Sequence, residues 1–146
     1  MMRRRFSKEH GQAVVEFALL TPFLLAFILL IIDSGLLAFS YVSASNAVRE
    51  GARCGTVGGT SDAIAGRVSG TYNGVATSDP ATVSYDDGSG NPVSVSNVQI
   101  GDNIKVTAHY DYTWMTLAFV PGLPDVSFDK STTMRMETTQ ITKGCP

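Results

Sequence analysis

A long apolar run near the N-terminus is the strongest pattern in the chain. Residues 17–32 contain no charged side chain, and Thr21 is their single polar one. These sixteen residues would rise about 24 Å as a helix, slightly less than the ~30 Å hydrocarbon core of a bilayer. Residues 13–15 are also apolar and make up the difference. The pattern predicts a transmembrane segment over about 13–35, with Glu16 one turn inside one face and Asp33 at the other.

Beyond Asp33 the apolar positions recur at helical spacing instead of forming a continuous run. They are Leu36, Leu37, Ala44, Ala47 and Val48, with Asp33, Ser40, Ser43, Ser45 and Asn46 between them. We therefore expect one continuous helix from about residue 12 to residue 54, stopped by Gly55 and the Gly58-Gly59 pair. Thr60 or Ser61 can then cap a short helix over residues 62–69, which carries Ile64 and Val68 on one face.

From Val75 onward the pattern favours β-strands. Two candidate strands, residues 81–85 and 92–100, flank a turn-rich insert over residues 86–91. Residues 104–112 alternate apolar and polar side chains without a break, and residues 126–137 do so more loosely. The link between them, residues 115–125, holds Leu117, Phe119, Val120 and Leu123. It is too apolar for a free loop, so it either packs on the first helix or meets a partner.

These elements predict the α+β class: a long N-terminal helix, membrane-spanning in its first half, followed by a small antiparallel β domain. The expected division is a basic segment over residues 1–11, the helix over residues 12–57, and the β domain over residues 58–146. At 146 residues the chain has room for one small domain besides the membrane segment.

Charge is divided unevenly along the chain. Residues 1–11 carry four basic groups and one acidic group, net +3, whereas residues 12–146 carry seven basic and twelve acidic groups, net −5. Short Lys/Arg-rich flanks stay in the cytoplasm, so we expect the N-terminus inside and the β domain on the extracytoplasmic, periplasmic side. The acidic remainder has no basic stripe that would neutralise phosphates, which argues against nucleic acid as a partner.

The two cysteines, Cys54 and Cys145, both fall on the expected outer side of the membrane. In an oxidising compartment an even count is typical of a disulfide, which here would tie the end of the first helix to the end of the chain. The alternative is two independent thiols, one buried and one on a loose tail.

No catalytic arrangement emerges from the sequence, and no cofactor is indicated. His109 falls on the polar face of a strand, where a solvated surface residue is favoured over a metal ligand. The acidic, glycine-rich insert at 86–91 lacks the ligand spacing of an EF-hand, so a solvated hairpin turn is favoured over a calcium loop. The glycines lack the strand–glycine–helix context of a phosphate-binding loop. The chain is therefore not expected to be an enzyme.

Two short motifs carry a resemblance to a known family. Gly11-Gln12-Ala13-Val14-Val15-Glu16-Phe17 precedes the apolar run, and Asn46-Ala47-Val48-Arg49-Glu50-Gly51-Ala52-Arg53 follows it. Together they resemble the TadE-like pseudopilins, minor pilins of the tight-adherence (Flp) pilus systems within the type IV class. The resemblance is strong over residues 11–57 and weak beyond them.

The resemblance implies that a prepilin peptidase cuts between Gly11 and Gln12. Glu16 then becomes the fifth residue of the mature chain, and it would neutralise the terminal ammonium of a neighbouring subunit during assembly. The alternative for Glu16 is a carboxylate that reaches the cytoplasmic headgroups without a partner. The main type IV pilins usually begin their mature chain with phenylalanine, whereas this chain would begin with Gln12. The resemblance therefore implies cleavage at this position but not methylation of the new amine.

The function that this resemblance implies is a role in assembling a Flp pilus for adhesion, in which the chain starts, caps or regulates the filament. The implied partners are the prepilin peptidase, other minor pilins, the main Flp pilin, the assembly platform in the inner membrane and the lipid bilayer. Two alternatives stay open. One is a membrane-anchored extracytoplasmic binding domain. The other is an exported soluble protein cut near Ala44, where Val42-Ser43-Ala44 would serve as a cleavage site.

Overall fold

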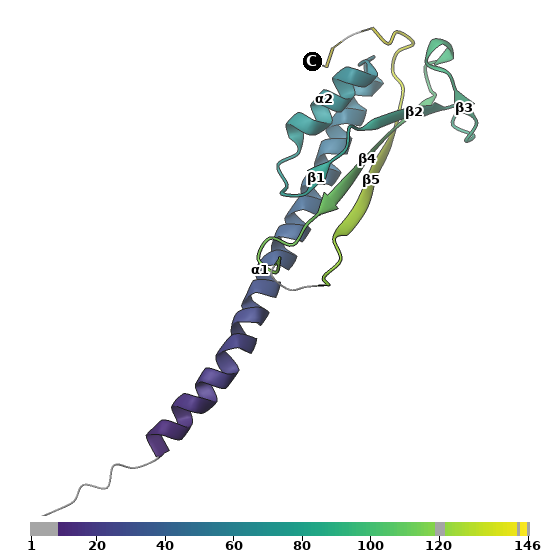
Figure 1. Ribbon diagram of the computed structural model, residues 1–146. Helices are drawn as coiled ribbons and strands as arrows, with labels where there is room; N and C mark the ends of the chain where they lie inside the picture. Colours follow the sequence, from purple (N-terminus) through teal and green to yellow (C-terminus); the bar gives the residue numbers. More distant parts are fainter. Residues whose placement is uncertain (1–8, 119–121, 143, 146) are drawn as a thin grey trace, which may run out of the picture.

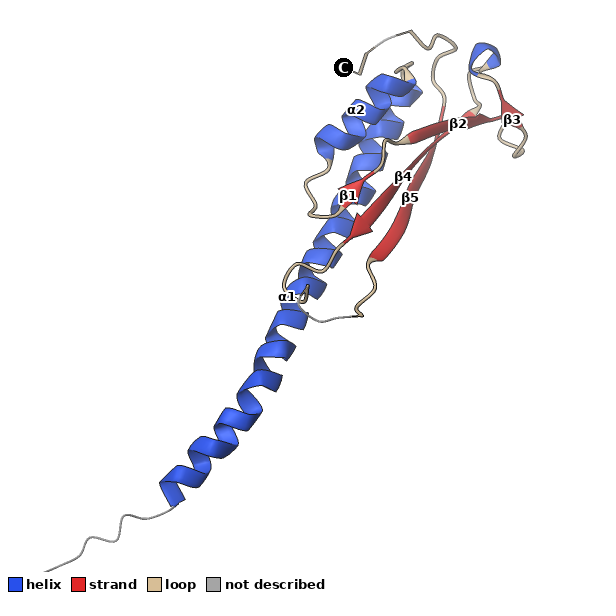
Figure 2. Ribbon diagram, viewed as in Figure 1, coloured by secondary structure: helices blue, strands red, loops and turns tan. Residues whose placement is uncertain are grey.

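The computed structural model describes residues 9–118, 122–142 and 144–145 of the chain. One long helix, α1 (Glu9–Thr56), runs through the whole structure, and a small domain packs on its C-terminal half (Figure 1). The second helix, α2 (Ser61–Thr71), and an antiparallel sheet lie against that half, while the N-terminal half projects alone (Figure 2). The predicted α+β class is confirmed.

The sheet is organised around its longest strands. Strand β4 (Asn103–Tyr112) pairs along its full length with β5 (Val126–Arg135) on one edge. The other edge of β4 is shared by β1 (Thr77–Ser78) and β2 (Thr82–Asp86), and β3 (Pro92–Val93) extends the sheet beyond β2. All these pairings are antiparallel, as the sequence predicts for the β domain.

The core forms where α1 meets α2 and the inner face of the sheet. The alternation predicted along β4 is confirmed, because every second side chain is buried: Ile104, Val106, Ala108, Tyr110 and Tyr112. On α1 the packing face is built from small residues, chiefly Ala44, Ala47 and Ala52, with Val48. A side chain at Gly51 would strike Val68 of α2, and one at Gly55 would strike Ile104 of β4. Small residues therefore let both layers approach the helix closely.

The end of α1 differs from the prediction in one respect. Gly55 was expected to stop the helix, but the helix continues to Thr56. The stop is at Gly58, which has a φ of 94° and donates its N–H to the Gly55 carbonyl, while Gly59 donates to Cys54. This pair of bonds is the Schellman arrangement, which needs a residue in the left-handed region. Gly55 is instead a packing residue.

Other boundaries shift by a few residues. Helix α1 already includes Glu9, the first described residue, whereas its start was predicted at about residue 12. Helix α2 spans Ser61–Thr71, and the side chain of Thr60 caps it by accepting the Ala63 N–H. The strand predicted over residues 92–100 is wrong beyond Val93, because a 3₁₀ turn, η1 (Val95–Asn97), follows. The apolar alternation breaks there, and the turn brings Val98 into the core.

Candidate functional site

The residues singled out at the N-terminus lie on the free end of α1. Gly11, Gln12 and Glu16 are all exposed, and together with Val15 and Leu19 they line an open hollow along one face of the helix. Gln12 and Glu16 are four residues apart and therefore neighbours on that face. Within the described part of the chain the Glu16 carboxylate has no hydrogen-bond or ion-pair partner. Its charge is available to a group outside this molecule.

The rest of the projecting segment is apolar and uncovered. Within the described residues α1 is the one helix long and apolar enough to cross a membrane, and none of its most hydrophobic window is buried in the domain. Its exposed side chains include Phe17, Phe23, Phe27 and Ile31. Exposing these large hydrophobic side chains to water is unfavourable in free energy. Contact with lipid or with neighbouring apolar helices would remove that unfavourable exposure.

Asp33 marks the point where the domain begins, and it is fully buried, with 0% of its surface exposed. The sequence placed it at the outer membrane interface but did not predict its contacts. Its Oδ1 accepts the Tyr112 hydroxyl at 3.1 Å and the Met115 N–H at 3.2 Å. Its Oδ2 accepts the Thr116 hydroxyl at 2.7 Å and the N–H groups of Thr116 and Leu117, both at 3.1 Å. A buried carboxylate needs such a set of donors to remain charged.

These donors come from one short stretch at the end of β4. Tyr112 is the last residue of the strand, and residues 115–117 belong to the connection between β4 and β5; its described residues, 113–118 and 122–125, are called the β4–β5 loop below. Burial, followed by the bond to Asp33, raises the pKa of Tyr112 to about 12, so its hydroxyl keeps the donated proton at neutral pH. The prediction that this link packs on the first helix is confirmed for residues 115–117. Phe119 and Val120 lie outside the described residues.

Two serines continue the attachment further along α1. Ser40 Oγ accepts the Val75 N–H at 3.0 Å, and Ser43 Oγ accepts the Asn73 N–H at 2.8 Å. The sequence pattern set Asp33, Ser40 and Ser43 apart from the apolar face, but all three are buried on the side facing the domain. Each accepts a hydrogen bond from a backbone N–H that has no partner in a strand or helix. A polar side chain is needed at these buried positions, because an unpaired buried N–H is unfavourable.

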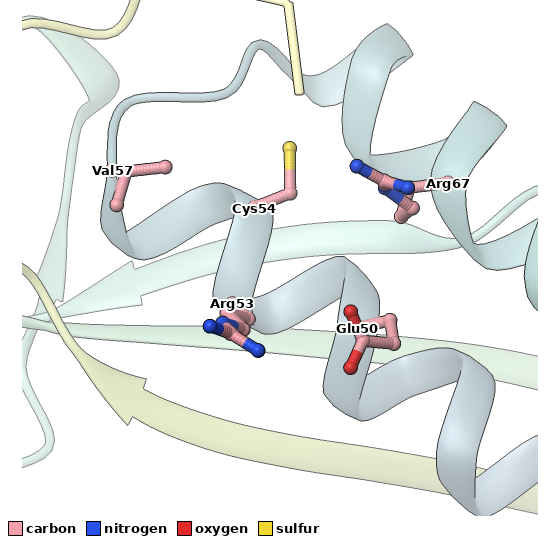
Figure 3. A pocket seen from close by; sticks show the side chains of 5 residues that line it. All are labelled: Glu50, Arg53, Cys54, Val57 and Arg67. Atoms are coloured by element: carbon pink, nitrogen blue, oxygen red, sulfur yellow. The ribbon is translucent and has the colours of Figure 1, made fainter. Parts of the chain in front are cut away.

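The disulfide predicted between Cys54 and Cys145 is present, with the Cα atoms 5.1 Å apart. It ties the last turns of α1 to the end of the chain, across a separation of 91 residues. An open hollow beside it is lined by side chains from α1, from the turn that follows it and from α2 (Figure 3): Glu50, Arg53, Cys54, Val57 and Arg67. Its sulfur is bonded, so the hollow offers no thiol nucleophile, and we assign no chemistry to it.

The described residues bring together no group of three His, Cys, Asp or Glu side chains that would hold a metal ion. His109 lies on the exposed face of β4 as predicted, between Asp129 at 2.6 Å and Asp111 at 3.2 Å. The hydrogen bond to Asp129 is the main cause that raises the pKa of His109 above its usual value. At the hairpin turn, Asp87 accepts the N–H groups of Ser89 and Asn91, so its carboxylate closes the turn.

Comparison with known proteins gives one match. The model of the family described as TadE-like protein matches residues 11–53, a segment that includes Gly11, Gln12, Glu16 and Asp33. No curated protein and no solved structure matches the chain. The family match therefore confirms the predicted resemblance over residues 11–53, which lie within the long N-terminal helix.

Proposed function

We propose that this chain is a minor pilin, or pseudopilin, of a tight-adherence (Flp) pilus, anchored in the cytoplasmic membrane and taking part in pilus assembly for adhesion. The observation that carries the proposal is the uncovered apolar half of α1, within the segment that matches the TadE-like family. A helix of this kind needs lipid before assembly and other apolar helices afterwards. Its partners would be the bilayer, the inner-membrane assembly platform, other minor pilins and the main Flp pilin.

Maturation would begin with cleavage between Gly11 and Gln12 by a prepilin peptidase. The basic leader, residues 1–11, keeps that bond at the cytoplasmic face. Because Gly11 and Gln12 both lie within α1 as the structure describes it, the bond is part of a helical turn, and a peptidase needs that turn to open. A side chain at Gly11 would meet no atom within 4 Å, so no packing holds this turn closed. Glycine also lowers the cost of opening it, since it is a poor helix former.

Cleavage would create an ammonium on Gln12, one turn from Glu16. In the proposed assembly step Glu16 pairs with the ammonium of a neighbouring subunit, because a carboxylate and an ammonium attract strongly in a low dielectric. Leaving either charge unpaired beside hydrocarbon is unfavourable. The exposure of Glu16, and the absence of a partner for it within the described residues, support a contact outside the chain.

The export alternative fits the structure poorly. Ala44 is fully buried in the middle of α1, where it packs in the core. A cut there would remove Asp33, Ser40 and Ser43 from the domain, together with the backbone groups that they bond. The remaining alternative, a plain anchored binding domain, differs from the proposal in keeping Met1 as its N-terminus.

The N-terminus of the membrane-bound protein distinguishes these functions. We expect N-terminal sequencing to find Gln12, and Gly11→Leu to leave an uncut precursor in the membrane. Gly35→Leu is the matched control, because Gly35 lies on the same helix and a side chain there also meets nothing within 4 Å. Normal maturation of Gly11→Leu, or a wild-type chain that begins at Met1 or Ser45, would refute the processing step.

The pairing role is tested separately by Glu16→Gln. The variant should insert and be cleaved normally, since the leader and Gly11 are unchanged and one acid has been removed from the span. It should then restore less piliation than wild type in cells lacking this chain, because the amide cannot neutralise the incoming ammonium. Glu50→Gln, at an exposed glutamate of the same helix, is the control. Equal piliation by Glu16→Gln and wild type would contradict the pairing role.

A further inference from the structure

The β4–β5 loop contacts α1 at the outer end of the apolar segment. The Thr116 hydroxyl, whose one proton lies closest to Asp33 Oδ2 at 2.7 Å, is also 3.2 Å from the backbone carbonyl of Leu29, so that carbonyl is the weaker acceptor of a shared hydrogen bond. Leu29 precedes Asp33 by one helical turn and belongs to the apolar run. The loop therefore extends past the last charged residue of the domain attachment and reaches the apolar segment itself. Figure 1 shows the described chain directly after β4 beside α1, at the end of the domain from which the helix projects.

The length of the apolar segment of α1 indicates how deep in the membrane the contact between Thr116 and Leu29 lies. Residues 12–32 rise about 31 Å as a helix, close to the ~30 Å of a hydrocarbon core, so Asp33 lies at the outer boundary. Leu29 then lies about 6 Å further in, at 1.5 Å per residue. A loop hydrogen-bonded to both residues lies at the level where headgroups meet acyl chains.

The loop presents large apolar side chains at this level, beside the exposed Thr113 and Asp125. Met115 is 60% exposed and Leu123 is 37% exposed, although residues 115–117 of the same loop are hydrogen-bonded to the helix. Trp114 donates its indole N–H to the Pro124 carbonyl at 2.8 Å, which fastens the two arms of the loop to each other. The polar atom of the indole is thus satisfied within the protein. An aromatic ring with apolar neighbours is the composition found where proteins meet the membrane interface.

We propose that the β4–β5 loop is a second membrane contact, which seats the extracytoplasmic domain on the outer leaflet of the bilayer through Trp114, Met115 and Leu123. The contact rests on the proposed anchoring of α1 in the membrane. Lipid is the occupant because the loop is hydrogen-bonded to α1 at Asp33, where the uncovered apolar span ends, so its exposed apolar side chains lie at the same level as the end of that span. The loop holds no Lys or Arg, so its attachment is hydrophobic and does not depend on anionic headgroups.

The proposed contact between the β4–β5 loop and the outer leaflet would fix the orientation of the extracytoplasmic domain. The three consecutive N–H groups of residues 115–117 are fixed by Asp33, so the loop cannot swing away from α1 on its own. With one contact on the helix and one on the leaflet, the domain has a set height and tilt above the membrane. Leaving the membrane for a filament requires both contacts to be released together.

The single tryptophan of the chain, Trp114, makes the proposal directly testable. The full chain is reconstituted alone in phosphatidylcholine vesicles whose acyl chains carry bromine either near the carbonyl end or near the methyl end. Bromine quenches tryptophan emission at short range. We expect strong quenching by the shallow bromine and little by the deep one. The same result is expected when part of the lipid is replaced by phosphatidylglycerol.

Charge substitutions locate the contact. Met115→Asp with Leu123→Asp should lose most of the shallow quenching. The matched control, Val95→Asp with Ile100→Asp, changes two exposed apolar residues that belong to η1 and the segment after it, and it should keep the quenching. Loss in both variants, or in neither, would overturn the assignment of the seat to this loop.

Resistance to alkaline extraction separates this proposal from the proposed function. An extracted chain refutes the membrane anchor and the seat together. An inserted wild-type chain without shallow quenching refutes the seat and leaves the anchor standing. Trp114 emission that changes only as the chain is packed more densely in the vesicles would show that the loop meets a second protein copy, and the lipid proposal would be wrong. Uncut and cleaved chains should give the same quenching, since the leader lies on the other side of the membrane.

Discussion

Asp33→Asn removes the central contact between α1 and the domain while changing the side-chain volume very little. The carboxylate is fully buried and accepts from the Tyr112 hydroxyl, the Thr116 hydroxyl and the N–H groups of Met115, Thr116 and Leu117. Asparagine keeps one acceptor oxygen but presents an NH₂ group in place of the other. Whichever way the amide turns, donors that now point at an oxygen would face another donor.

The magnitude follows from the number of donors left without an acceptor. Each Asp33 oxygen serves at least two donors, and a buried donor without an acceptor costs about 1–3 kcal/mol. Thr116 and Tyr112 can rotate their hydroxyls, whereas the backbone N–H groups cannot move freely. We therefore expect the free energy of unfolding to fall by about 3 kcal/mol, a large part of the ~5–15 kcal/mol typical of a domain.

The assay uses the full chain in detergent micelles, with urea unfolding followed through Trp114 emission and with amide hydrogen exchange. The midpoint should fall, and the amides of residues 115–117 should lose protection before those in the centre of β4. Ser34→Ala is the control, because the exposed Ser34 hydroxyl bonds only within its own helix, to the Leu30 carbonyl. An unchanged midpoint together with unchanged protection at residues 115–117 would refute the argument that Asp33 attaches the loop.

Three further predictions concern the domain. Tyr112→Phe should lower the free energy of unfolding by about 1–2 kcal/mol, whereas Tyr110→Phe should leave it nearly unchanged in urea unfolding, because the buried Tyr110 hydroxyl has no hydrogen-bond partner among the described residues. Replacing Cys54 and Cys145 by serine should cost up to about 4 kcal/mol in the same assay, since the bridge closes a long loop of the unfolded chain. The Asp129 hydrogen bond raises the pKa of His109, so its contribution to stability is full below about pH 6.5 and disappears as the pH rises through the raised value. NMR titration of the His109 ring should give a lower pKa in Asp129→Asn than in wild type.

The regular elements were predictable because their signals are local and periodic. The apolar run and the helical spacing after it identified α1, and the strict alternation over residues 104–112 identified β4 with its buried face. The looser alternation after Val126 also identified β5. These patterns reflect one face of an element meeting a core, which a sequence records residue by residue. The pairing of Cys54 with Cys145 was open in sequence and is settled by the fold.

The attachment of the domain to α1 was not predictable in the same way. Asp33, Ser40 and Ser43 look like solvated positions in sequence because they are polar, yet each is buried against a backbone donor some 30 or more residues away. Gly55 looks like a helix stop, but its role is to admit Ile104. In both cases the reason lies on another element, and no local pattern on α1 records it. An acid at the end of an apolar run was the one available signal for Asp33.

The two acidic residues that bound the apolar half of α1 have different environments, and the difference bears on how the chain would leave the membrane. Asp33 has its charge satisfied by donors from the domain, so the helix and the domain must move as one body. Glu16 has no partner within the described residues. In the proposed assembly the helix passes outward, and Glu16 moves from one turn inside the membrane face deeper into the hydrocarbon core, where a carboxylate costs about 2.5–3.5 kcal/mol even on translocon-insertion scales. An ammonium from a neighbouring subunit lowers that cost, because the pair carries no net charge. The helix is therefore bound to its own domain at Asp33 and depends on another subunit at Glu16. Movement of the chain out of the membrane would then be favourable only when that subunit is in place.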